Sequence, residues 1–74
     1  MTNPEEIRWR IEAALPGARV EVADTTGGGD HFEVRVTAPA FADRTLVEQH
    51  QLVYGALGNL MPEIHALSLR TMVP

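Results

Sequence analysis

Cysteine and lysine are both absent from this chain of 74 residues. Without cysteine, the chain by itself can form no disulfide, no thiolate nucleophile and no sulfur-ligated metal site. Without lysine, six arginines face ten acidic residues, which gives a formal net charge of −4. This acidic balance argues against a general affinity for the phosphate backbone of nucleic acids, because that affinity depends on clustered positive charge.

Long apolar runs are also missing. No run approaches the roughly 20 residues that a membrane-spanning helix needs. The first residues, "MTNPEEIRWR", lack the charged start and the apolar stretch of a signal peptide. We therefore expect a soluble cytoplasmic protein. The length predicts a single domain over residues 1–74 with a small core.

Helix-start residues stand at the beginning of the chain. Asn3 is the expected N-cap, Pro4 suits the first helical turn, and Glu6 occupies the acidic position of a capping box. Trp9 lies off the apolar stripe of this helix. It is expected to cover the helix edge, and contact with a partner is the less favoured interpretation. The Pro-Gly pair at 16–17 ends the helix. The stripe at helical spacing consists of Ile7, Ile11, Ala14 and Leu15.

The apolar period then changes to two. Residues 18–23 and 32–37 both alternate apolar and polar side chains, which is typical of half-buried strands. The intervening "DTTGGGD" predicts a flexible turn and therefore an antiparallel hairpin. A phosphate-binding loop is the less favoured interpretation, since it would lead from a strand into a helix and commonly carries lysine.

A second helix is predicted from residue 46 to about residue 61, where Pro62 ends it. A short helical turn around residues 40–43 precedes this helix. Asp43 or Thr45 is expected to cap the N-terminus of the longer helix. Its apolar stripe consists of Leu46, His50, Val53, Leu57, Leu60 and Met61.

Residues 64–73 predict the last strand, with His65, Leu67 and Leu69 on one side by parity. The element order favours an α+β fold, in which the helices pack on one face of a three-stranded mixed sheet. A long helix precedes the last strand, so a crossover can set this strand parallel to a neighbour.

At this point the chain resembles the BolA-like proteins. The resemblance spans roughly residues 7–74, and its motifs are "VEVADTT", "GDHFEVRV", the phenylalanine of "APAFADRTLVEQHQLVYGAL" and "EIHALSLRT". It implies an αββααβ fold similar in topology to the second type of KH domain. It also implies a non-enzymatic partner of a monothiol glutaredoxin, in iron–sulfur trafficking or iron-dependent regulation. The free chain is expected to be a monomer or a weak homodimer.

The resemblance further implies a [2Fe-2S] cluster shared with that partner, and no cofactor for the chain alone. The glutaredoxin and its glutathione would supply the sulfur ligands. His65, in the final "HA" motif, would supply nitrogen and is the main candidate metal ligand. This fits the chemistry, because histidine can replace cysteine on an iron–sulfur centre and raises its reduction potential.

The three histidines each have a plainer alternative. His65 on its own could be a half-buried histidine that closes the core edge through one hydrogen bond. His31 is the second candidate ligand, although the "TTGGG" loop lacks the donor that many relatives carry there, and a surface polar role is the alternative. His50 lies on the apolar stripe and is expected at the core edge, hydrogen-bonded to backbone.

A DNA-binding protein and an enzyme are the two other function classes. A DNA-binding transcriptional regulator is the alternative, if "FADRTLVEQHQLVYGAL" folds as a helix–turn–helix that offers Arg44, Gln49 and Gln51 to the groove. Asp43 and Glu48 in the same segment weigh against it. An enzyme is not expected, because the sequence offers no nucleophile with a base and no cofactor motif. No catalytic residues are therefore predicted.

Overall fold

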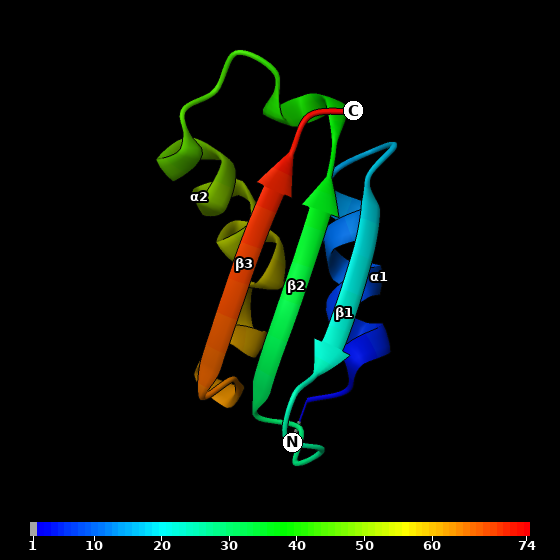
Figure 1. Cartoon of the computed structure of the whole chain (residues 1–74), viewed down its shortest axis with the longest axis vertical. Coiled ribbons are helices and arrows are strands. Elements are labelled where there is room, and N and C mark those ends of the chain that lie inside the picture. Colours follow the sequence, from blue (N-terminus) through cyan, green and yellow to red (C-terminus); the bar gives the residue numbers. More distant parts are fainter. Residues whose placement is uncertain (1) are drawn as a thin grey trace.

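A three-stranded sheet forms the centre of the molecule. The computed structural model describes residues 2–74. The strands are β1 (Arg19–Asp24), β2 (His31–Thr37) and β3 (Ala66–Met72), in the order β1-β2-β3 (Figure 1). β1 pairs with β2 antiparallel and β2 pairs with β3 parallel. The predicted hairpin and the parallel last strand are both confirmed.

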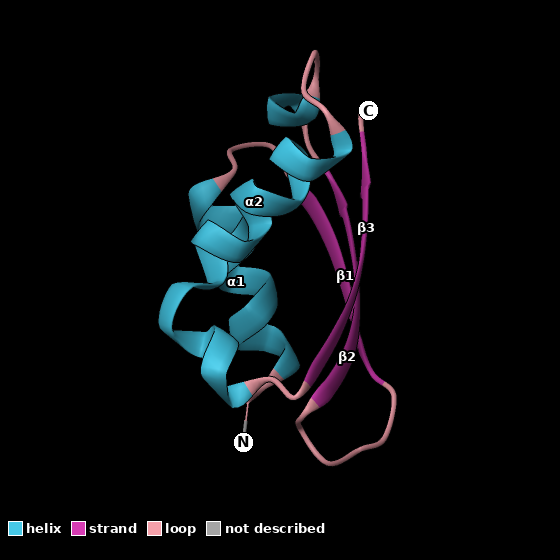
Figure 2. Ribbon diagram, turned by 90° about the vertical axis from the view of Figure 1, so that its left-hand side faces the viewer, coloured by secondary structure: helices cyan, strands magenta, loops and turns pink. Residues whose placement is uncertain are grey.

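Both α-helices lie on the same face of this sheet (Figure 2). α1 (Pro4–Ala14) precedes the hairpin, and α2 (Leu46–Leu57) connects β2 to β3. Two 3-10 helices flank α2, namely η1 (Pro39–Phe41) and η2 (Gly58–Glu63). The predicted α+β architecture with a mixed sheet is therefore confirmed. Helix α2 supplies the crossover that a parallel strand pair requires.

The helix caps follow from local side-chain chemistry. The side chain of Asn3 accepts a hydrogen bond from the amide of Glu5 (2.8 Å), as the sequence predicted. Thr45, rather than Asp43, caps α2, and a complete capping box links it to Glu48. The backbone and side-chain hydrogen bonds with Thr45 hold the pKa of Glu48 below its usual value, and nearby Arg44 contributes.

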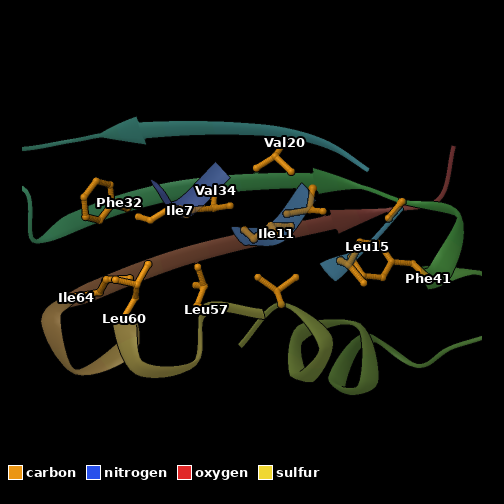
Figure 3. Close-up of a cluster of buried hydrophobic side chains, with 13 residues drawn as sticks. Ile7, Ile11, Leu15, Val20, Phe32, Val34, Phe41, Leu57, Leu60 and Ile64 are labelled. Carbon is orange, nitrogen blue, oxygen red and sulfur yellow. The ribbon is translucent and has the colours of Figure 1, made fainter. Parts of the chain in front are cut away.

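The core lies between the helices and the sheet, as Figure 3 shows. Three members of the predicted stripe of α1 are buried, whereas Ala14 is exposed. Alternate residues of β2 point into the core and the others face solvent, so one face of the sheet is exposed to solvent. The buried residues are Ile7, Ile11, Leu15, Val20, Phe32, Val34, Val36, Ala38, Phe41, Val53, Leu57, Leu60 and Ile64.

Three predicted features are wrong in detail. α2 ends at Leu57 rather than near residue 61, because Gly58 adopts a positive φ of 49° and the chain tightens into a 3-10 helix. Leu46 was placed on the apolar stripe, yet it is 61% exposed at the first position of α2. Trp9 is 66% exposed and does not cover the edge of α1.

The helix–turn–helix prediction is also wrong. Pro39–Phe41 forms a 3-10 helix of three residues, which is too short to serve as the first helix of that motif. Residues 42–45 then lead directly into α2. The segment therefore contains one α-helix. Between residues 2 and 74, no helix is both long enough and apolar enough to cross a membrane.

Candidate metal-binding site

His31 and His65 lie side by side at one end of the sheet. The centroids of their imidazole rings are 4.9 Å apart, and the ring planes are inclined by 47°. His31 is the first residue of β2, and His65 immediately precedes β3. The parallel register pairs His31 with Ala66, so the two chain segments enter the sheet together. The fold thus brings together the two candidate ligands named from the sequence.

The backbone fixes the entry point of β3. The amides of His65 and Ala66 both donate to the carbonyl of Asp30, at 2.8 Å and 3.0 Å. β3 therefore begins at Ala66, and the predicted strand over residues 64–73 is wrong by two residues at its start and one at its end. His65 lies at the bend that leads into the strand, where its side chain is exposed. The alternative of a half-buried histidine that closes the core edge is therefore wrong.

His31 is held by the loop that joins β1 to β2. The carbonyl of His31 accepts hydrogen bonds from both the amide (3.0 Å) and the hydroxyl (3.2 Å) of Thr25. Its side chain remains 37% exposed. Nε2 of His31 lies 3.8 Å from Oδ2 of Asp30, a separation too long for a hydrogen bond. Because both imidazoles reach solvent, a molecule docking at this end of the sheet can contact them.

The third histidine lies elsewhere. His50 projects from the middle of α2, where it is half-buried and lines a groove with Leu69 and Thr71 of β3. Its ring lies edge-on to Tyr54, with the centroids 6.3 Å apart. The buried Nε2 atom has no hydrogen-bond partner. His50 is at the core edge as predicted, but Nε2 does not make the expected backbone hydrogen bond.

The histidine pair offers an incomplete set of metal ligands. Over residues 2–74, no three side chains of histidine, cysteine, aspartate or glutamate gather closely enough to hold a metal ion. This end of the sheet can therefore supply two imidazole nitrogens as metal ligands. Tetrahedral iron or zinc takes four ligands, so the remaining donors would come from another molecule.

Comparison with known proteins assigns the fold to a family. The sequence model of the BolA-like protein family matches residues 11–74. The chain belongs to the BolA-like family. It is 38% identical over 71 residues to the protein BOLA2 of Arabidopsis thaliana, covering 95% of this chain and 76% of that protein.

Solved structures agree with this assignment. A bolA protein homologue from Coxiella burnetii matches with a TM-score of 0.78 and 43% identity, over 100% of this chain and 94% of the other. The BolA domain of SufE1 from Arabidopsis thaliana matches with a TM-score of 0.85 and 31% identity, over 96% and 91%. The BolA fold thus also occurs as one domain of a differently named protein.

Two residues of this BolA-like chain that support the site were missed in the sequence. Asp24 and Asp30 flank the glycine loop, and no sequence pattern singled out either of them. The carboxylate of Asp24 in fact accepts hydrogen bonds from three loop amides, and the carbonyl of Asp30 holds the start of β3. The "D-T-T-G" spacing was an available indication, because aspartate before a glycine turn commonly binds the amides that follow it.

Proposed function

We propose that this BolA-like chain is a non-enzymatic partner of a monothiol glutaredoxin, with which it co-ligates a [2Fe-2S] cluster in iron–sulfur trafficking or iron-dependent regulation. The observation that carries the proposal is the pairing of His31 and His65, whose ring centroids are 4.9 Å apart. His65 is the main ligand in this proposal, and His31 is the second.

The donor chemistry of the site is consistent with such a cluster. Iron–sulfur clusters are usually held by four cysteine thiolates, and in one class two histidines replace two of these on a single iron. When bound, a cluster with nitrogen ligands has a higher reduction potential than its all-sulfur counterpart. This chain supplies two imidazoles and has no cysteine. The thiolate ligands would therefore come from the glutaredoxin and its glutathione.

The position of the pair also supports an intermolecular site. His65 is exposed and His31 is partly exposed, at the end of the sheet where β2 and β3 begin (Figure 1). The amides of residues 65 and 66 are bound to Asp30, so docking would not need to order this part of the backbone. A preordered ligand loses less conformational entropy on binding.

The residue types at the site are consistent with a non-enzymatic role. Cysteine and lysine, two common covalent nucleophiles, do not occur in the sequence. Within residues 2–74, the histidine pair has no third histidine, cysteine, aspartate or glutamate side chain placed to complete a metal site with it. The proposed chemistry at this end of the sheet is therefore metal ligation.

The test is a titration of this chain into a [2Fe-2S]-loaded monothiol glutaredoxin, followed by visible circular dichroism. The wild type should reshape the cluster bands. The His65→Ala variant should leave them unchanged, and His31→Ala should weaken the change. His50→Ala is the matched control, because it removes an imidazole that lies away from the pair, and it should behave like the wild type.

Two results would overturn the proposal. If His65→Ala reshapes the bands as the wild type does, His65 is not a ligand. If the wild type leaves the spectrum unchanged, the glutaredoxin partnership fails.

A further inference from the structure

The loop between β1 and β2 is organised around one carboxylate. Oδ1 of Asp24 accepts hydrogen bonds from the amides of Gly27 (2.8 Å) and Thr26 (3.3 Å), and Oδ2 accepts one from the amide of Gly29 (2.9 Å). Gly27 and Gly29 both adopt positive φ values, 75° and 77°. Three hydrogen bonds to a charged acceptor thus select one conformation from the many that glycines allow.

The same loop is bonded to both histidines. At its start, the amide and hydroxyl of Thr25 donate to the carbonyl of His31. At its end, the carbonyl of Asp30 accepts the amides of His65 and Ala66. The loop held by the Asp24 carboxylate is therefore connected by hydrogen bonds to the backbone of both histidines.

We propose that Asp24 is a positioning residue for the histidine pair. Its carboxylate fixes the loop, the loop fixes the carbonyl of Asp30, and that carbonyl holds His65 beside His31. The metal-binding role of the pair rests on the proposed function, whereas the positioning itself does not. Removal of the carboxylate would leave three loop amides, those of Thr26, Gly27 and Gly29, without their common acceptor.

This role is separable from general stability. The loop and the pair lie at one end of the sheet (Figure 1), and Asp24 is not part of the hydrophobic core. The loop residues Thr25, Thr26, Gly27 and Gly28 are exposed. Loss of the loop conformation therefore exposes little apolar surface, and the sheet and helices should persist.

The experiment compares Asp24→Ala and Asp24→Asn with the wild type. Asp43→Asn is the charge-matched control, because it removes a carboxylate from the loop that precedes α2. Figure 1 shows that loop at the opposite end of the sheet. The first readout is the nuclear Overhauser effect between the ring protons of His31 and His65 in the free chain. The second is the affinity for a [2Fe-2S]-loaded monothiol glutaredoxin, and far-UV circular dichroism reports the fold.

Asp24→Ala should lose the ring-to-ring effect and bind about 10-fold more weakly, the lower end of the loss typical when support of a metal ligand is removed. Asp24→Asn keeps one oxygen for the amides of Thr26 and Gly27, so it should be intermediate and folded. Asp43→Asn should match the wild type in both readouts.

The outcomes distinguish the two proposals. A folded Asp24→Ala or Asp24→Asn chain with an unchanged ring-to-ring effect and unchanged affinity overturns the positioning role. Loss of the effect in the variants, together with a wild type that leaves the cluster spectrum unchanged, overturns the proposed function and supports the positioning role. Loss of both effect and affinity supports both.

Discussion

Phe41 and Trp9 are aromatic residues in opposite environments. Truncation of Phe41 should strongly lower the free energy of unfolding, whereas truncation of Trp9 should hardly change it. Phe41 is fully buried in the core, whereas Trp9 is 66% exposed on α1. Truncation of a buried phenylalanine to alanine typically costs about 3–5 kcal/mol, because apolar contacts are lost and a cavity remains. Truncation of an exposed side chain away from special features usually changes stability by no more than about 0.5 kcal/mol.

The size of the chain makes the first loss severe. A domain of this length has a free energy of unfolding of about 4–11 kcal/mol. Phe41→Ala would therefore remove a large part of the total. With an m-value near the lower end for small proteins, about 1 kcal/mol per molar urea, the urea midpoint should fall by about 3–5 M. Trp9→Ala should leave the midpoint nearly unchanged.

Urea unfolding followed by circular dichroism at the helical minimum measures both variants. Tryptophan fluorescence is unsuitable, since Trp9 is removed in one of them. Phe41 and Phe32 lie at opposite ends of the core (Figure 3), and His31 directly precedes Phe32 in the sequence. A folded Phe41→Ala chain should therefore keep the His31–His65 contact. If Trp9→Ala lowers the midpoint as much as Phe41→Ala, the burial assigned to these residues is wrong.

Three further predictions concern α2. Thr45→Ala removes the capping box and should cost about 1 kcal/mol in urea unfolding, and an equal midpoint in wild type and variant would show that the cap contributes nothing. The pKa of Glu48 is lowered from its usual 4.5, so its stabilising effect is present above pH 4.5 and is lost as the pH falls through the lowered value. The stability difference between wild type and Glu48→Gln should therefore shrink on acidification, and a difference that grows instead would contradict this sign. Gly55→Ala should stabilise the protein by about 1 kcal/mol, because an added methyl group at Gly55 meets open space within the helix. Gly58→Ala should destabilise the protein, because φ is 49° at that position. Thermal unfolding that ranks the two variants the other way would refute the helix end at Leu57.

Local patterns predicted the elements well where one side-chain rule dominates. The stripe of Ile7, Ile11 and Leu15 and the alternation along β2 both became buried faces. The capping residues Asn3 and Thr45 act as expected, since their hydrogen bonds span only a few residues. Such features depend on contacts that the sequence itself brings together.

The site was harder to predict because it depends on contacts between distant segments. The contact between His31 and His65 follows from the parallel register of β2 and β3, which no local pattern specifies. The start of β3 depends on the carbonyl of Asp30, and the end of α2 depends on the positive φ of Gly58. Sequence patterns named the two ligands, but the structure was needed to show that they meet.

The crossover through α2 has a consequence for the order of folding. β1 and β2 are joined by a short loop and can pair early, whereas β3 must wait for α2 to be placed and for a long loop to close. During synthesis, His31 leaves the ribosome well before His65, so a nascent chain can hold a hairpin and one imidazole without the second. The histidine pair therefore forms only when the last strand docks. Two imidazoles side by side are consequently present only in a domain that has finished folding.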